Sequence, residues 1–164
     1  MIYNLIGQPH SGKSTLAIHL KKVLDLNNPS RKAFIIDGDF LRKILNNKDY
    51  SENGRRDNVS KAYAIAKYLD ADDFHDVIIA VISPFLDLRE EFKFTADVTE
   101  IYLHTKNIRG RENFHVENFE KPETDFIEID TTDVDELTSL NELLEKIQSK
   151  KYKDDGISKE QLHS

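Results

Sequence analysis

The residues most capable of chemistry lie in the segment GQPHSGKS, which runs from Gly7 to Ser14. It fits the pattern G-x-x-x-x-G-K-[ST], in which glycines let backbone N–H groups turn inward around phosphate oxygens. Lys13 can reach the terminal phosphates of a nucleotide, and the Ser14 hydroxyl can hold Mg²⁺. We expect the Lys13 side chain to face solvent until phosphates arrive. The residues predicted to bind the phosphates of ATP are Gly7, Gln8, Pro9, His10, Ser11, Gly12, Lys13, Ser14 and Thr15.

Two carboxylates in the segment IIDGDFLR could complete a phosphoryl-transfer site. Asp37 and Asp39 flank Gly38 at the end of an expected strand, where the loops of a parallel sheet line the ligand crevice. One carboxylate could hold Mg²⁺ through water, and one could accept a proton from an attacking hydroxyl. The later run VIIAVIS ends without an acidic residue, so the metal-linked carboxylate is expected from this pair. The alternative is that Asp37 ends the strand and Asp39 caps the next helix.

Arginine is distributed differently from lysine. Six of the seven arginines fall in or beside expected site loops, whereas the sixteen lysines are spread mainly over surface-like stretches. The planar fork of arginine suits phosphate or sulfate, which lysine cannot match. Asn53, Arg55 and Arg56 open an expected helix, where positive charge is mildly unfavourable and therefore favours a ligand. A solvated helix start is the alternative for these residues, and a plain turn is the alternative for Ser83 and Pro84.

Apolar runs alternate with helical periodicity along the chain. Short runs rich in Ile, Val and Phe that do not alternate cleanly are typical of strands covered on both faces. We predict strands at Ile2–Ile6, Ala33–Ile36, Val77–Ile82, Glu100–Leu103 and Phe126–Ile129. We predict helices at Ser14–Leu26, Asp39–Leu45, Glu52–Leu69, Leu86–Phe94 and Val134–Ile147. This order predicts an α/β, three-layer P-loop NTPase fold with a five-stranded parallel sheet flanked by helices.

Length and composition limit the classes of protein to consider. The 164 residues suffice for one domain, and we assign 1–147 to the P-loop domain and 148–164 to a charged, flexible tail. A net charge of −7 without a basic tract argues against a nucleic-acid-coating role. The absence of cysteine excludes disulfides and thiolate catalysis and fits a cytoplasmic location. We expect no N-terminal signal, no membrane span and no transition-metal site.

Four blocks, in this order, resemble the adenylylsulfate kinase family, whose members phosphorylate the ribose 3′-hydroxyl of adenosine 5′-phosphosulfate with MgATP: GQPHSGKST, IDGDFLR, DYSENGRR and VISPFLDLR. A weaker fifth block, Phe114–Thr131, is similar to the family segment between the lid and the last strand, and the resemblance covers about residues 2–147. It implies ATP and Mg²⁺ as cofactors, a small-molecule acceptor, and Asp39 as the base or metal-linked acid beside Ser14. The residues implied to bind the acceptor are Asp37, Arg42, Asn53, Arg55, Arg56, Ile82, Ser83, Pro84 and Phe85.

Several positions depart from the family pattern. The stretch between IDGDFLR and ENGRR is short and lacks a Gly-Phe-Ser piece whose ring stacks on the acceptor adenine in the family. Tyr50 stands where an arginine is common, Gly54 where a branched apolar residue is common, and Phe85 where tyrosine is usual. A changed base pocket could mean a different acceptor.

The lid expected over the site is also abbreviated. The family's Lys-Gly-Leu-Tyr-Lys-Lys segment is missing, and Lys106–Asn113 is the bridge that remains. Arg109 and Arg111 are therefore predicted to supply the catalytic charge of a mobile lid that excludes water less well. Two alternatives stay open: a kinase for another nucleoside, nucleotide or sugar hydroxyl, and a nucleotide-binding module without catalysis. We expect no nucleic-acid or membrane partner, and a possible homodimer.

Overall fold

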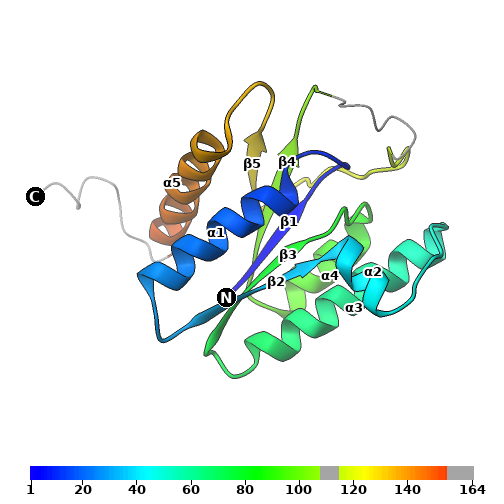
Figure 1. Cartoon of the computed structure of the whole chain (residues 1–164), viewed down its shortest axis with the longest axis horizontal. Coiled ribbons are helices and arrows are strands. Elements are labelled where there is room, and N and C mark those ends of the chain that lie inside the picture. The colour runs from blue at the N-terminus through cyan, green and yellow to red at the C-terminus, as the bar shows by residue number, and fades with distance from the viewer. Residues whose placement is uncertain (108–114, 155–164) are drawn as a thin grey trace, which may run out of the picture.

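A five-stranded parallel sheet forms the centre of the protein (Figure 1). The structure, a computed structural model, describes residues 1–107 and 115–154. The strand order is β2-β3-β1-β4-β5, and each neighbouring pair is parallel. The strands are β1 (Ile2–Ile6), β2 (Lys32–Asp37), β3 (His75–Ala80), β4 (Val98–His104) and β5 (Phe126–Asp130). The helices are α1 (Lys13–Asn27), α2 (Gly38–Ile44), α3 (Glu52–Asp70), α4 (Leu86–Thr95) and α5 (Glu136–Asp154).

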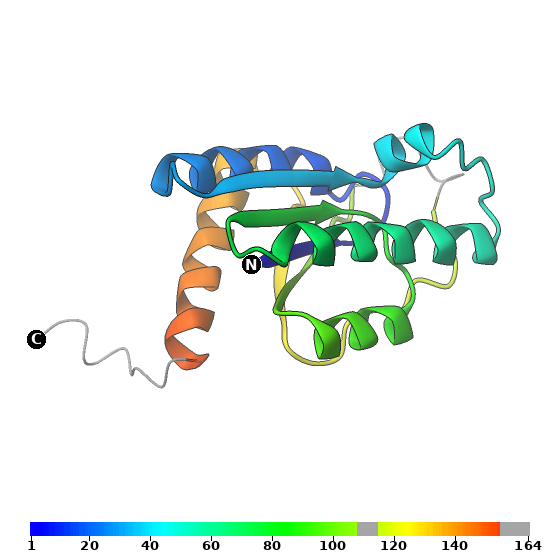
Figure 2. The same cartoon turned by 90° about the horizontal axis from the view of Figure 1, so that it is seen from below.

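Helices cover both faces of the sheet, α1 and α5 on one and α3 and α4 on the other (Figure 2). Successive strand side chains point to opposite faces. In β1, Ile2 packs in the core under α3 and α4, while Tyr3 packs in the core under α1. In β3, Val77 and Ile79 join the first of these cores and Ile78 joins the second. Both faces are therefore apolar, which explains the uninterrupted apolar runs. In residues 1–107 and 115–154, no helix is long and apolar enough to cross a membrane.

The predicted three-layer α/β fold is confirmed, and all predicted strands and helices occur in the predicted order. The largest difference concerns α5, which continues past Ile147 to Asp154. Gln148 Nε2 donates to the Tyr152 hydroxyl one turn later at 3.0 Å, and Lys150 pairs with Asp125. The first part of the predicted tail is therefore helical, while residues 155–164 lie outside the described part of the chain. The division of the chain at residue 147 stays a prediction.

The carboxyl ends of the strands meet at one edge of the sheet because all the strands are parallel. β1 ends at Ile6 immediately before the glycine-rich loop, and β2 ends at Asp37. β3 ends at Ala80, three residues before Ser83. The sheet thus brings the three sequence blocks that carry the predicted chemistry to one edge, as expected for ligand crevices in parallel sheets.

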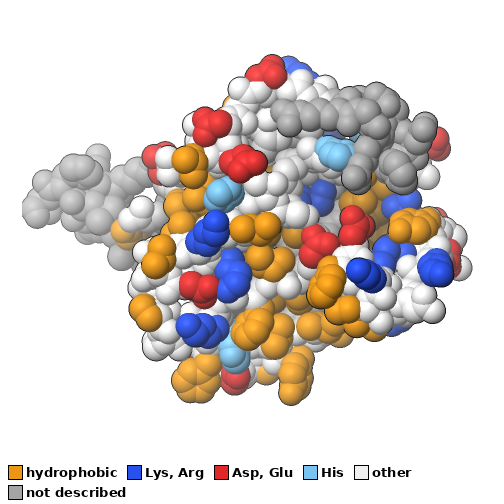
Figure 3. Space-filling view, in the orientation of Figure 1, with side chains coloured by type: hydrophobic (Ala, Val, Ile, Leu, Met, Phe, Trp, Pro, Cys, Tyr) orange, Lys and Arg blue, Asp and Glu red, His pale blue; other side chains and the backbone are white. Residues whose placement is uncertain are grey.

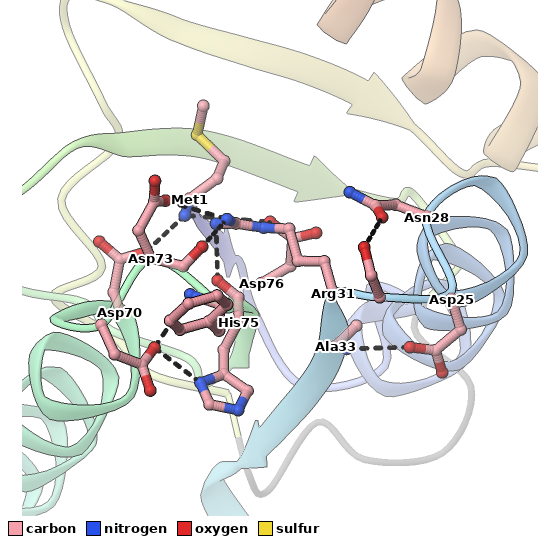
Figure 4. A network of polar contacts seen from close by, with 12 residues as sticks. Met1, Asp25, Asn28, Arg31, Ala33, Asp70, Asp73, His75 and Asp76 are labelled. Carbon is pink, nitrogen blue, oxygen red and sulfur yellow. Dashed lines mark hydrogen bonds and ion pairs between the residues drawn. The ribbon is translucent and has the colours of Figure 1, made fainter.

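The opposite edge holds a network of ion pairs (Figure 4). Arg31 Nε lies 2.8 Å from Asp76 Oδ1, and the terminal ammonium of Met1 pairs with Asp70 and lies 3.9 Å from Asp76. Arg31 also donates from Nη2 to the carbonyl of His75 at 2.7 Å. These contacts join the amino ends of β1, β2 and β3. Arg31 is therefore a structural arginine on the side of the sheet away from the candidate site.

Candidate active site

Two glycines determine the shape of the loop between β1 and α1. Gly7 has φ 144°, and a Cβ there would overlap the carbonyl oxygen of Leu103. Gly12 has φ 91° and stands at the N-cap of α1, so the helix begins at Lys13. Thr131 Oγ1 donates to the Ser11 carbonyl at 3.1 Å and ties the loop to the end of β5. Only glycine adopts these conformations without strain, which is why a short sequence pattern can specify the loop.

The side chain of Lys13 is buried, which corrects the expectation that it faces solvent. Its ammonium donates to the carbonyls of Gly7 at 2.9 Å and Gln8 at 2.7 Å, and to Ser11 Oγ at 3.2 Å. The loop curves around the ammonium and presents its own carbonyl oxygens to it. Burial lowers the pKa of Lys13 to about 8, against the opposing attraction of the two nearby carboxylates. Phosphate oxygens binding here would replace the loop oxygens as partners.

Asp37 ends β2, as the alternative reading expected, and its carboxylate contacts both α2 and Ser14. Its Oδ1 accepts from the amides of Asp39 and Phe40, at 3.0 Å each, so Asp37 caps α2. Its Oδ2 accepts from Ser14 Oγ at 2.7 Å. The capping alternative for Asp39 is wrong because Gly38 already belongs to the helix, so the cap is Asp37, two residues earlier. The Asp39 carboxylate is left exposed at the cavity described next.

A cavity of about 690 Å³ lies at the carboxyl edge of the sheet. It unites most of the predicted site: Pro9, His10, Gly12, Lys13, Ser14, Thr15, Asp37, Asp39, Arg42, Arg55, Ile82, Ser83 and Pro84. Its other lining residues include Tyr50, Asn58, Thr105, Thr131 and Val134. In the space-filling view, acidic and basic side chains lie side by side around α2 (Figure 3). The cavity is large enough for a small-molecule ligand of the usual size.

The loop between α2 and α3 holds two of the positions that depart from the family pattern, Tyr50 and, at its end in α3, Gly54. A Cβ at Gly54 would overlap the carbonyl oxygen of Asp49, so the shortened loop leaves no room for a branched side chain there. Arg42 is buried and donates to the Asp49 carbonyl at 2.7 Å. Its guanidinium lies 4.5 Å from the ring centre of Tyr50, and Arg55 Nε donates to the Tyr50 carbonyl at 2.9 Å. Tyr50 is nevertheless 60% exposed, at the wall of the cavity.

Three predicted acceptor residues are not part of the cavity lining. Arg56 pairs with Asp87 at 2.9 Å and with Glu52 at 3.1 Å, and its guanidinium lies 4.1 Å from the ring centre of Phe85. The fork expected to bind an acceptor is thus occupied by a carboxylate, and direct contact would require that pair to open. Asn53 is exposed, and neither Asn53, Arg56 nor Phe85 lines the cavity.

Buried side chains hold the turn that follows β3. Ser83 is buried, has φ 47°, and its Oγ lies 2.6 Å from the Tyr63 hydroxyl. Burial raises the pKa of Tyr63 to about 12, so the phenol keeps its proton. Arg89 is fully buried, donates to the Ser83 carbonyl at 2.7 Å, and makes an ion-pair contact with Glu100 at 2.7 Å that lacks the direction of a hydrogen bond. The plain-turn alternative for Ser83 therefore understates how firmly this turn is held.

Gly7 and Ser11 belong to the phosphate loop but do not line the cavity. The Gln8 side chain does not line the cavity and instead contacts the backbone of Val116. Arg109 and Arg111 lie outside the described residues. Sequence reasoning missed Glu100 and Thr131, because nothing in a strand residue or a post-strand threonine signals a distant partner.

The comparisons with known proteins agree with these blocks. A family model described as adenylylsulphate kinase matches residues 1–114. An adenylyl-sulfate kinase of Bacteroides thetaiotaomicron is 30% identical over 164 aligned residues, which cover 86% of this chain and 80% of that protein. An adenylyl-sulfate kinase of Burkholderia ambifaria is 40% identical over 86 residues, which cover 52% of this chain and 46% of that protein.

A solved structure of the Mycobacterium tuberculosis APS kinase in complex with AMPPNP and APS has the same fold, with a TM-score of 0.72 at 21% identity. The match covers 90% of this chain and 96% of that one. The family model spans well over half of the residues, and the loop and acidic motif that it includes border one cavity. The chain therefore belongs to the adenylylsulfate kinase family.

Proposed function

We propose that this protein transfers the γ-phosphate of ATP to the 3′-hydroxyl of adenosine 5′-phosphosulfate and yields 3′-phosphoadenylylsulfate, a step of sulfate assimilation. Family membership supports this reaction. The observation that carries the proposal is a single cavity with two walls. Lys13 and the phosphate loop form one wall, and Arg42 and Arg55 contribute to the other together with the carboxylate of Asp39.

The proposed chemistry relies on positioning and charge neutralisation rather than on a covalent intermediate with the protein. The acceptor hydroxyl would align opposite the leaving oxygen of ADP. Lys13 would exchange the carbonyls of Gly7 and Gln8 for phosphate oxygens, where negative charge develops. Asp39, exposed at the cavity, would orient the hydroxyl and accept its proton.

The oxygen donors beside the phosphate loop fit Mg²⁺, which prefers hydroxyl, carboxylate and water ligands. Ser14 Oγ and Asp37 Oδ2 are 2.7 Å apart. The sequence pattern indicated Ser14 and Asp39 as metal ligands; the contact with Ser14 favours Asp37 as the carboxylate linked to the metal. Bound Mg²⁺ would neutralise charge on the phosphates, and Asp39 would remain for the acceptor hydroxyl.

The acceptor carries a phosphosulfate group, and its negative charge calls for cations in the opposite wall. Arg42 and Arg55 supply them at the cavity, while Arg56 would join only if its pair with Asp87 opens. We assign the lid charge to Arg109 or Arg111. Slower transfer, and slower ATP hydrolysis without acceptor, in the Arg109→Ala or Arg111→Ala variant would support this role. Unchanged rates in both variants would exclude it.

The proposal includes a setting for the reaction. We propose that the protein acts in the cytoplasm on a small molecule, without a nucleic-acid or membrane partner, and that it forms a homodimer. Light scattering of the purified protein tests the assembly, since a monomer mass at micromolar concentration would overturn the dimer.

Incubation with MgATP and a panel of acceptors tests the reaction. ADP release with adenylylsulfate, but not with other nucleotides or sugars, is the expected result. Turnover of a different acceptor would reassign the substrate, and tight ATP binding without turnover would indicate a binding module. Asp39→Asn and Asp37→Asn form a matched pair. The first should remove transfer with ATP binding kept. The second should weaken Mg²⁺ binding, so that transfer needs a higher Mg²⁺ concentration.

A further inference from the structure

One connecting segment, residues 115–121, is yellow in Figure 1. It contacts both the phosphate loop and Pro84–Leu86, which we call the acceptor loop. Five of its residues are exposed, and Val116 and Phe119 are half-buried. The Phe119 ring stacks on Tyr102 of β4 at a centroid distance of 5.9 Å, and the following Pro122 is buried. A segment anchored at both ends and at Phe119 can transmit a shift of one loop to the other.

Gln8 makes the contact at the nucleotide end. Its side-chain amide pairs with the peptide unit of Val116: Nε2 donates to the Val116 carbonyl at 2.8 Å, and Oε1 accepts from the Val116 amide at 3.0 Å. The side chain faces a second cavity of about 440 Å³ behind the phosphate loop. The carbonyl of the same Gln8 accepts from Lys13 Nζ at 2.7 Å. Gln8 therefore connects the ammonium that phosphates would recruit with the segment 115–121.

Glu120 makes the contact at the acceptor end. Its amide donates to the Pro84 carbonyl at 2.9 Å, and its carboxylate accepts from the Leu86 amide at 2.7 Å. Leu86 is the first residue of α4, whose N-cap residue Phe85 offers no side-chain cap, so a distant segment supplies it. Arg89 adds a third bond, from Nη2 to the Glu120 carbonyl at 2.6 Å.

We propose that Gln8 and Glu120 are positioning residues, through which segment 115–121 couples nucleotide binding to the placement of the acceptor loop at Pro84–Leu86. When Lys13 turns to phosphate, the Gln8 carbonyl loses its ammonium donor, so Gln8 can shift and the paired Val116 shifts with it. The shift reaches Pro84, Leu86 and Arg89 through the three bonds at Glu120. The Gln8 side chain does not line the cavity and contacts Val116 instead, so we expect phosphate to bind without touching it.

This inference rests on the proposed function for its choice of acceptor. Calorimetry with the full chain would measure adenylylsulfate affinity with and without AMPPNP, and the ratio of the two affinities is the coupling. We expect a ratio that departs from one by about fivefold or more in the wild type, within the usual range of coupling between sites. Gln8→Met keeps the length of the side chain and removes both bonds to Val116, so the ratio should approach one. A loss of adenylylsulfate affinity that is equal with and without AMPPNP cancels in this ratio.

Glu120 offers a matched pair of variants. Glu120→Gln retains an oxygen that can accept from the Leu86 amide, whereas Glu120→Ala retains none. We expect Glu120→Ala to lower the coupling and raise the acceptor KM with kcat little changed, and Glu120→Gln to restore both. A purely structural role would instead change melting temperature and leave the affinity ratio intact. An unchanged ratio in both Gln8→Met and Glu120→Ala would overturn the inference.

A second readout separates this inference from the proposed reaction. Amide exchange of residues 84–89 is followed on adding AMPPNP alone, with no acceptor present. Wild-type protein should change its protection there, and Gln8→Met should not. If adenylylsulfate fails to bind while this change occurs, the proposed acceptor is wrong and the coupling stands. If adenylylsulfate is turned over but protection is identical in both proteins, the reaction stands and the coupling is wrong.

Discussion

The two walls of the cavity are built in different ways. The nucleotide wall is largely one run of chain, in which Gly7 and Gly12 set the backbone and Lys13 bonds to its own loop. The acceptor wall is assembled from separate segments, among them α2, the loop with Tyr50, the start of α3 and the turn at Ser83. A local wall can be specified by a short pattern, whereas an assembled wall depends on contacts between residues far apart in the sequence.

The partners of the basic residues differ in the same way. Lys13 is held by neutral oxygens, which phosphate can displace. Arg56 is held by carboxylates, and Arg42 by a carbonyl of a loop that fits closely against α3. We therefore expect changes in the nucleotide wall to remove transfer to any acceptor. Changes in the acceptor wall should alter which acceptor binds and how well.

Loss of Lys13 should have the largest effect. Lys13→Ala removes a charge that stabilises the transferring phosphoryl group, worth about 3 kcal/mol or more, or a hundredfold or more in kcat. The fold should persist, because removal of a buried ammonium relieves a desolvation cost. Steady-state kinetics and a melting curve measure both effects, with Lys22→Ala on the exposed face of α1 as control. Activity within a few fold of the wild type would contradict the assignment of the phosphate loop.

The nucleotide wall is also the part that sequence reasoning predicted best. The glycine pattern, the strand before it and the helix after it are all local, and the structure has each of them. Local reasoning failed where a contact crosses the chain. It could not tell that Asp37 caps α2 while bonding to Ser14, or that the Gln8 side chain turns away to Val116. It also placed Lys13 in solvent, since the loop's inward carbonyls cannot be read from a motif.

The sequence indicated several residues of the acceptor wall, but it did not predict their contacts. The arginines of this wall were recognised, yet their partners Asp49 and Asp87 come from other segments and carry no signal of their own. Gly54 stood out as unusual in the sequence, and the reason is the backbone of Asp49 passing beside it. Packing between segments decides such details, and one sequence does not reveal it.

Gly54→Ala tests how closely the acceptor wall is fitted. The new methyl group would overlap the carbonyl of Asp49, so the loop or α3 must move. We expect a loss of about 1–3 kcal/mol in the free energy of unfolding, and a rise in acceptor KM because Arg42 and Tyr50 move with the loop. Gly38→Ala is the control for stability, since its methyl group would meet Val81 at an ordinary 3.4 Å. Equal melting temperatures for the two variants would show that the loop yields freely.

Arg56→Lys should have a smaller effect, confined to the acceptor. The substitution keeps the charge but loses the guanidinium, whose Nη1 contacts both carboxylate oxygens of Asp87, whose Nε contacts Glu52, and which lies over the Phe85 ring. We expect a rise of about three- to tenfold in acceptor KM, as estimated from the loss of one to two exposed bonds, with ATP KM unchanged. Asp87→Asn separates direct from indirect action: a similar rise indicates that the pair positions Phe85. A fall in melting temperature with normal kinetics would make Arg56 purely structural.

The smallest expected effect is a dependence of ATP affinity on pH, and it belongs to the nucleotide wall alone. Burial lowers the pKa of Lys13 to about 8 from its usual 10.5, so a rise in pH removes the proton from the free protein first. Phosphates prefer the protonated ammonium, so binding takes up a proton, and affinity falls as pH rises through this value. From a pKa of about 8, affinity at pH 8 should be about twofold weaker than at pH 7. Calorimetry at pH 8, in buffers of different ionisation enthalpy, measures the proton uptake directly. Lys13→Arg is the control, because the arginine guanidinium stays protonated. The proton uptake that remains in this variant comes from the titration of ATP itself. Equal proton uptake in both proteins would mean that the buried ammonium titrates as an ordinary lysine.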